Sequence, residues 1–240
     1  MSAVIFILLN SPKGRAFKKF VSDEIEKSKA AGKAIVACAD SGAELAFPDI
    51  KPDFIIGDLD SISRKTKAFY EDAGVEFIKY PADKDFTDFH LALEKACETA
   101  GGNAKKIEVF GGLGRRLDHT LANIYVAAAF QNDRKIPVAM HESGTHVYTA
   151  SSDFSNPLRV EEFIGPGDTV TLRPLFNSVL IEKTLGLKYA VNDGKLETFE
   201  SRGTSNVATG SETSVKIRKG ELLLVHVEKR RKLKKRFEFE

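Results

Sequence analysis

Two aspartates that follow a short apolar run are the residues of this chain best suited to chemistry. Residues 54–56, Phe-Ile-Ile, are apolar and rich in β-propensity, so they predict a buried strand that Gly57 ends. Asp58 and Asp60 come next, and positions two apart on an extended segment point to the same side. We therefore expect two converging carboxylates, which suit a hard cation such as Mg²⁺. A polar turn after a strand is the alternative, because Asp is common in turns.

Other polar segments follow predicted strands and favour a site for a metal and a polyphosphate. Asp40 follows the apolar run 34–39, an acidic turn at 83–88 follows the run 75–78, and a basic glycine-rich turn at 111–119 follows another strand. Carboxylates would hold Mg²⁺, while Lys and Arg would neutralise phosphate oxygens. The glycine-rich turn has neither a Walker A sequence nor a full dinucleotide fingerprint. A surface ion pair between Arg116 and Asp118 at a helix start is the alternative for that turn.

Alternating strands and helices must position these residues. Apolar runs predict strands at residues 4–9, 34–39, 54–56, 75–78, 106–110 and 136–140. Helical spacing recurs between them, as in residues 15–30, and such alternation implies a parallel sheet with right-handed crossovers. After residue 148 short strand-like segments replace helices, and 218–221 reads as a hairpin connection. We expect an α/β domain at 1–147 with a mostly parallel sheet and an antiparallel β-sandwich domain at 148–240.

Composition restricts the class of protein. The chain has 240 residues, 42% of them hydrophobic, and a net charge of +2 that favours no particular partner. The basic run 229–236 suits a solvated extension better than a nucleic-acid contact, since no aromatic platform accompanies it. Cys38 and Cys97 lie in apolar surroundings and predict buried free thiols. Residues 4–9 are too short for a signal core or a span, so we expect a cytoplasmic protein without membrane or nucleic-acid partners.

The motifs together resemble the bacterial-type thiamine pyrophosphokinases. The 52–61 segment, PDFIIGDLDS, is similar to the family's PD-x-IIGDFDS, and residues 84–88, KDFTD, fit KD-x-TD. Residues 114–124, GRRLDHTLANI, fit GGR-x-DH-x-x-ANI, and 40–43, DSGA, resemble DGGA. In the second half, GLKY at 186–189 and GTSN at 203–206 also look like family segments. The resemblance covers nearly the whole chain, in order.

The resemblance implies an enzyme that transfers the diphosphate of ATP to the hydroxyl of thiamine, giving thiamine diphosphate and AMP. It implies a Mg²⁺-dependent homodimer with ATP as co-substrate. Carried over by motif, the residues that position metal and phosphates are Asp40, Asp58, Asp60 and Asp88, with Asp58, Asp60 and Asp88 as metal ligands. The nucleotide site would comprise Lys84, Asp85, Thr87, Arg116, Asp118 and His119. Ser205 and Asn206 would contact thiamine.

Some positions depart from the family pattern, and two other functions stay open. Ser41 stands where Gly is usual, Glu44 where Asn is common, and His90 where Glu is frequent. Arg115 replaces a Gly and either adds a phosphate contact or faces solvent. A catalytically silent nucleotide- or thiamine-binding regulator on the same fold is one alternative, and a nucleic-acid-binding protein using the basic tail is the other.

Overall fold

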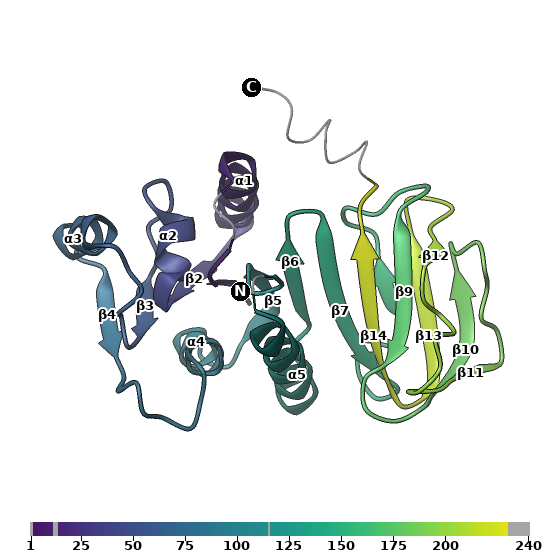
Figure 1. The fold of residues 1–240 in the computed structure, drawn as a ribbon. Helices are drawn as coiled ribbons and strands as arrows, with labels where there is room; N and C mark the ends of the chain where they lie inside the picture. The colour runs from purple at the N-terminus through teal and green to yellow at the C-terminus, as the bar shows by residue number, and fades with distance from the viewer. Residues whose placement is uncertain (1, 12–13, 115, 230–240) are drawn as a thin grey trace. The chain divides into compact units, whose positions relative to one another are not determined.

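A computed structural model describes residues 2–11, 14–114 and 116–229 of the chain. The expectations for Arg115 and for the basic tail beyond Lys229 lie outside these residues. The chain divides into two compact units (Figure 1). Unit 1 comprises Met1–Ala127 and Met140–Glu142, and unit 2 comprises Ala128–Ala139 and Ser143–Glu240.

Unit 1 is built on a sheet with the strand order β6-β5-β1-β2-β3-β4. Its strands are β1 (Ala3–Leu8), β2 (Ala34–Ala39), β3 (Phe54–Gly57), β4 (Glu76–Lys79), β5 (Ala104–Phe110) and β6 (Val138–Glu142). Strand β1 pairs in parallel with β2 and β5, and β3 pairs in parallel with β2 and β4. Strands β1, β2 and β3 are continuously apolar because helices cover both faces of the sheet. The predicted mostly parallel α/β region is confirmed.

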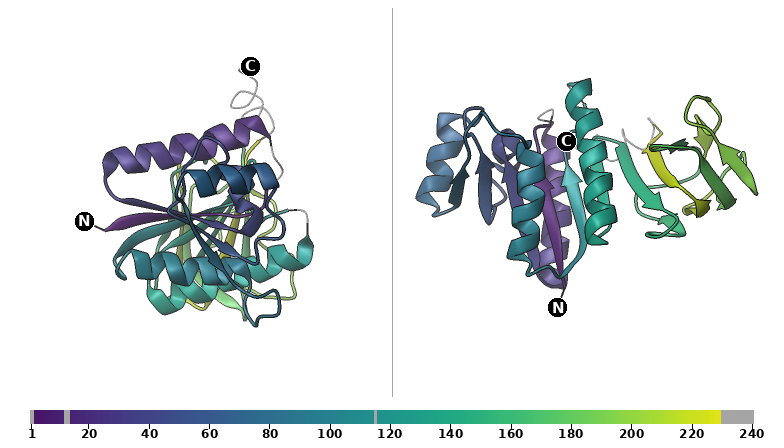
Figure 2. Two further views of the ribbon diagram at one scale, coloured as in Figure 1. Left: turned by 90° about the vertical axis from the view of Figure 1, so that its left-hand side faces the viewer. Right: turned by 90° about the horizontal axis from the view of Figure 1, so that it is seen from below.

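In the part of the chain that the structure describes, five α-helices flank this sheet. They are α1 (Arg15–Ala31), α2 (Ala43–Ala46), α3 (Arg64–Asp72), α4 (Asp88–Thr99) and α5 (Leu117–Arg134), and a 3₁₀ turn, Asp40–Gly42, precedes α2. The left view of Figure 2 shows α1 on one face of the sheet and α4 and α5 on the other. Phe17, Val21 and Ile25 on α1 are buried, and their spacing of four residues forms a single apolar stripe against the strands.

Two helices begin with side-chain caps. The Ser63 hydroxyl accepts a hydrogen bond from the amide of Thr66 at the start of α3. The Thr87 hydroxyl accepts one from the amide of His90 at the start of α4. Each cap satisfies an amide that has no partner within its helix. The second cap makes Asp88 the first residue of α4 and so fixes where its carboxylate lies.

The order of the strands determines where a ligand can bind in unit 1. The chain runs from β1 through β2 and β3 to β4, and then returns to add β5 on the other side of β1. The direction of the connections therefore reverses between β1 and β5. In open α/β sheets, ligands bind beyond the carboxyl ends of the strands at such a reversal.

Unit 2 contains two antiparallel sheets. One has the order β12-β9-β14-β7, and the other has the order β11-β10-β13-β8. The strands are β7 (Thr145–Ser151), β8 (Leu158–Val160), β9 (Thr169–Pro174), β10 (Val179–Leu185), β11 (Gly194–Leu196), β12 (Asn206–Val207), β13 (Thr213–Lys219) and β14 (Glu221–Val227). One apolar core contains Leu172 and Leu224 of the first sheet together with Ile181 and Val215 of the second. The expected antiparallel β-sandwich is confirmed, while the expected boundary at residue 148 falls inside β7, which pairs with β14 along its whole length.

Two further expectations concern the chain as a whole. Cys38 and Cys97 are buried free cysteines, as predicted. Across the described residues, every helix lacks the length or the apolar character needed to cross a bilayer.

We predict that Tyr70→Phe destabilises unit 1. The Tyr70 ring is fully buried, and its hydroxyl donates a hydrogen bond to the carbonyl of Ile50 at 2.8 Å. Removing the hydroxyl leaves a buried acceptor unsatisfied, so the free energy of unfolding should fall by about 1–3 kcal/mol. Urea unfolding followed by circular dichroism measures this change. Tyr80→Phe is the control, because Tyr80 is 36% exposed, and equal stability of the two variants would contradict the assignment.

Candidate active site

A pocket of about 650 Å³ opens at the predicted edge of the sheet in unit 1. Its walls include Asn10 after β1, Asp40 after β2, Gly112 after β5 and Glu142 at the end of β6. The pocket thus lies at the reversal of strand order and is built by segments far apart in the sequence. The residues that line the pocket include Asn10, Asp40, Ser41, Lys84, Asp85, Phe86, Thr87, Asp88, Arg116 and His119.

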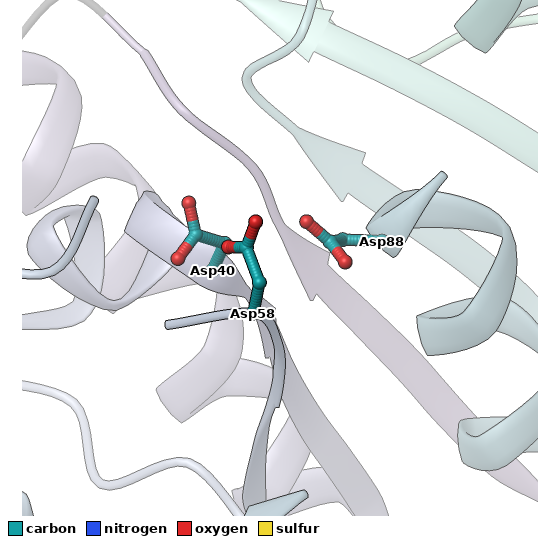
Figure 3. Close-up of side chains that lie close together, drawn as sticks. All are labelled: Asp40, Asp58 and Asp88. Atoms are coloured by element: carbon teal, nitrogen blue, oxygen red, sulfur yellow. The ribbon is translucent and has the colours of Figure 1, made fainter. Parts of the chain in front are cut away.

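Three carboxylates converge beside this pocket. Asp40 comes from the 3₁₀ turn after β2, Asp58 follows β3, and Asp88 is the first residue of α4. One oxygen of each lies within 4.8 Å of the others, and Figure 3 shows the three side chains directed toward a common space. All three are partly buried, so water screens their mutual repulsion less than it would on an open surface.

Gly57 leaves the space in which these carboxylates meet. Its φ is +147°, a conformation that residues with a side chain rarely adopt. A Cβ atom at this position would lie 3.0 Å from Cγ of Asp88 and 3.1 Å from Cβ of Asp40. The glycine that ends β3 is therefore required by the approach of two side chains from other elements.

The donor set fits a hard cation. Burial raises the pKa of the Asp40 carboxyl, hydrogen bonds from the Ser41 backbone and Ser61 oppose the rise, and the carboxylates of Asp58 and Asp88 add to it. Oδ1 of Asp40 is buried and, among the described residues, has no hydrogen-bond partner. A buried carboxylate oxygen without a donor is costly, and a cation among the three groups would remove that cost. Mg²⁺ prefers oxygen ligands of this kind.

Asp60 is not one of the three converging carboxylates, and the backbone between Asp58 and Asp60 is not extended as the expectation assumed. The expectation assumed an extended segment, but Leu59 has a φ of +66°, which turns the chain. The amide of Asp60 lies 3.5 Å from Oδ1 of Asp58, and its own carboxylate accepts a hydrogen bond from Ser61 at 2.8 Å. Asp40 lies close to Asp58 instead.

The segment before α4 brings a cation to the cluster. Nζ of Lys84 lies 3.1 Å from Oδ1 of Asp88, and its side chain is only 15% exposed. The same ammonium donates a hydrogen bond to the carbonyl of Pro81. The Thr87 hydroxyl is engaged in the helix cap, whereas the side chain of Asp85 is exposed on the pocket wall. Lys84 thus lies where it can contact both a carboxylate and a bound phosphate.

Arg116 and Asp118 form a two-pronged ion pair at the start of α5. Nη2 of Arg116 lies 2.5 Å from Oδ2 of Asp118, and Nε lies 3.2 Å from Oδ1. The hydrogen bond from Arg116 lowers the pKa of the Asp118 carboxyl and raises the pKa of the guanidinium. Both side chains are more than 60% exposed. The ion pair that was the alternative interpretation does form, and Arg116 with exposed His119 also lines the pocket.

The glycine-rich turn is tied to the strands beside it. The Gly112 amide donates to the carbonyl of Asn10, and its carbonyl accepts a hydrogen bond from the buried side chain of Asn123 at 3.1 Å. A Cβ on Gly112, whose φ is +82°, would lie 2.6 Å from Leu9. The Gly114 amide donates to the hydroxyl of Thr120. These contacts tie Gly112 and Gly114 to the end of β1 and to α5.

Sequence reasoning missed several residues of the pocket wall. Asn10 follows the first apolar run and Glu142 ends the sixth strand, so the rule that identified Asp40 would also have selected them. The Ser11 hydroxyl donates a hydrogen bond to the buried carboxylate of Glu142. Asn123 lay within a motif already recognised. Phe86 carried no chemical signal in the sequence, because it occupies a variable position between charged residues.

Ser205 and Asn206 lie in unit 2 and differ sharply in environment. Ser205 is exposed and has a φ of +59°. The Asn206 side chain is buried, accepts a hydrogen bond from the amide of Tyr189 at 3.0 Å and donates to its carbonyl at 2.6 Å. Both ends of this amide therefore hold the 186–189 loop, which leaves Ser205 as the residue of the two with its side chain open to solvent.

The residues that depart from the family pattern make contacts with their near neighbours in the structure. Ser41 lines the pocket, and its backbone donates to Asp40. The Glu44 carboxylate accepts a hydrogen bond from the amide of Ser63 at 2.7 Å, so it supports the start of α3. His90 lies on α4 with its ring against Phe86.

Comparison with known proteins agrees with these motifs. Residues 27–140 match the family model described as thiamin pyrophosphokinase, catalytic domain. Thiamine pyrophosphokinase 1 of rice, Oryza sativa subsp. japonica, is 28% identical over 189 residues, which cover 71% of this chain and 70% of that protein. Thiamine pyrophosphokinase of Bacillus subtilis is 40% identical over 75 residues, or 31% of this chain and 34% of that protein.

Solved structures show the same fold. The B. subtilis thiamine pyrophosphokinase structure matches with a TM-score of 0.73 at 21% identity, covering 94% of this chain and 99% of that one. The yeast thiamin pyrophosphokinase structure matches with a TM-score of 0.72 at 18% identity, covering 100% and 89%. Residues 27–140 of this chain are thus similar to the catalytic domain of thiamin pyrophosphokinases.

Proposed function

We propose that this chain is a thiamine diphosphokinase. It transfers the β,γ-diphosphate of ATP to the hydroxyl of thiamine and releases AMP. The observation that carries the proposal is the convergence of Asp40, Asp58 and Asp88 next to Lys84, at the reversal of strand order in unit 1. The relatives that the chain matches are named thiamine pyrophosphokinases. No observation favours a catalytically silent binder.

The reaction requires that the negatively charged phosphate groups be bound and that the thiamine hydroxyl be aligned with the β-phosphorus. The thiamine hydroxyl oxygen bonds to the β-phosphorus of ATP, the bond from that phosphorus to the α,β-bridging oxygen breaks, and the hydroxyl proton is lost. We assign the triphosphate to the pocket, with Lys84 and Arg116 near its oxygens and Asp85, Thr87, Asp118 and His119 shaping the wall. Two cationic side chains there stabilise charge that shifts toward the leaving AMP. Holding the hydroxyl in line supplies much of the rest of the rate.

We assign a Mg²⁺ ion to the carboxylate cluster. Asp40, Asp58 and Asp88 would hold it, and when bound it would neutralise phosphate charge and orient the diphosphate. The orphan oxygen of Asp40 and the space above Gly57 support this assignment. Asp60, which is not one of the three converging carboxylates and accepts a hydrogen bond from Ser61, would act on the phosphates.

For the acceptor, we assign a contact with thiamine to Ser205 and a positioning role to Asn206, which holds the neighbouring loop. We further propose that the protein acts in the cytoplasm, since the free thiols of Cys38 and Cys97 suit a reducing compartment. We propose neither a nucleic-acid nor a membrane partner.

Product analysis tests the proposed function. The protein is incubated with thiamine, ATP and Mg²⁺, and the products are separated. Thiamine diphosphate and AMP should accumulate in equal amounts, with no AMP when thiamine is omitted. Formation of ADP and thiamine monophosphate would overturn the diphosphate transfer.

We predict that Asp58→Asn lowers kcat/KM at saturating Mg²⁺ by about 100-fold or more, because the amide keeps the shape of the side chain but removes a charge from the cluster. Asp60→Asn should lower kcat/KM by less than about tenfold, since this side chain lies outside the cluster. Steady-state kinetics of both variants decide the matter. Equal losses would show that Asp60 reaches the metal during turnover.

We predict that Gly57→Ala abolishes high-affinity binding of Mn²⁺ as a probe for Mg²⁺. The added Cβ would lie 3.0 Å from Cγ of Asp88 and forces the carboxylates apart. Gly74→Ala is the control, because Gly74 also has a positive φ, +67°, but nothing lies within 4 Å of the added atom. It should lose about 1–2 kcal/mol of stability and keep the site. Titration followed by electron paramagnetic resonance measures the affinity, and a parent-like value in Gly57→Ala would contradict the prediction.

We propose a homodimer that uses the outer face of α5. Leu117, Leu121 and Tyr125 are 71%, 48% and 45% exposed, and their spacing of four residues places them on one face. Gathered exposed apolar side chains mark interaction surfaces.

We predict that the parent sediments at twice the chain mass and that Leu121→Glu sediments as a monomer. Ala30→Glu, on the exposed side of α1, should leave the dimer intact, and a dimeric Leu121→Glu would exclude this face.

A further inference from the structure

Phe86 presents an open aromatic ring to the pocket. It lines the wall between Lys84 and Asp88, and 54% of it is exposed. Phe89, three residues further on, also lines the pocket but is 3% exposed and belongs to the core. A single exposed aromatic residue needs no special explanation. Its place in the pocket that Asp40 and Asp88 also line, together with its contact with the His90 ring, points to a ligand.

The ring of Phe86 is held in place rather than left mobile on a loop. Its centroid lies 4.6 Å from that of the His90 ring, with an angle of 55° between the planes. The backbone between the two residues is fixed by the Thr87 cap, whose hydroxyl accepts the amide hydrogen of His90. Because the platform is preorganised, a ligand that stacks on it pays little to order the ring.

The charge around the ring favours a positively charged ligand. Asp83, Asp85 and Asp88 lie in the same segment, and the one cation among them, Lys84, is paired with Asp88. The segment therefore retains an excess of negative charge next to an aromatic face. A cation over such a face gains binding free energy from its attraction to the ring quadrupole and to the carboxylates. A neutral heterocycle gains from stacking alone.

We propose that Phe86 is the platform for the positively charged thiazolium ring of thiamine, with His90 behind it as the residue that holds it. This inference rests on the proposed function. The thiazolium carries the reacting hydroxyl on a two-carbon arm, so it must lie near the β-phosphorus and the carboxylates. The adenine of ATP is separated from the same phosphorus by the ribose and the α-phosphate. Phe86, two residues before Asp88, is close to the reacting end.

Steady-state kinetics of Phe86→Leu test the platform. The KM for thiamine should rise about tenfold, and the KM for ATP should stay within about twofold. Phe86→Tyr keeps the ring and should restore the parent value. Phe69→Leu is the matched control, because Phe69 is 42% exposed on α3 and packs against Phe47 outside the pocket. A rise confined to the KM for ATP would assign the ring to adenine and overturn the proposal.

Binding without turnover tests the role of charge. Equilibrium dialysis with an ATP analogue that has a methylene group between the α- and β-phosphates measures the affinity for thiamine and for its neutral thiophene analogue. The parent should prefer thiamine, and Phe86→Leu should lose about fivefold or more of that preference. Equal weakening of both ligands would overturn the cation contact.

The two experiments separate the inference from the proposed function. If the parent forms no AMP from thiamine and ATP, the diphosphokinase proposal fails. Weaker thiamine binding by Phe86→Leu would then still support the platform. If the parent forms AMP and Phe86→Leu matches it in every constant, the platform is excluded and the diphosphokinase proposal stands.

Discussion

The repulsion among three carboxylates is the constraint on which unit 1 depends. Asp40 and Asp58 follow two different strands and Asp88 begins a helix, and folding brings one carboxylate oxygen of each to within 4.8 Å of the others. Such a contact weakens the fold unless other features support it. The supports are visible: Gly57 makes room, Lys84 offsets one charge, and the Thr87 cap fixes the helix that carries Asp88. The repulsion among the carboxylates lowers the free energy of unfolding, and the same negative charge attracts a cation.

The glycine-rich turn also lines the pocket, and its glycines allow it to pack closely against β1. Gly112 packs where a side chain would collide with Leu9, and hydrogen bonds tie the turn to Asn10 and Asn123. Arg116 and His119, just before and within the first turn of α5, have exposed side chains and line the pocket. An exposed guanidinium beside a pocket suits a polyphosphate, whose charge moves during reaction.

How far the sequence alone predicts this architecture depends on the kind of signal. Apolar runs followed by aspartate located Asp40 and Asp58, because the ends of parallel strands meet at one edge. The family motif located Lys84 and Asp88. The alternation rule failed at Asp60, since it holds only for extended backbone and Leu59 has a positive φ. Phe86 could not be found, because its importance depends on which side chains approach the pocket in three dimensions.

The separate origins of the three carboxylates have a thermodynamic consequence. In the unfolded chain they are distant and bind a divalent ion no better than any aspartate. A ligand that needs all three therefore recognises the native state alone, and its binding free energy adds to the free energy of unfolding by mass action. With the proposed Mg²⁺ ion bound at the cluster, the free energy of unfolding of unit 1 would depend on the concentration of that ion. At low concentrations of the ion, no bound cation would offset the repulsion among the three carboxylates, and unit 1 would be less stable.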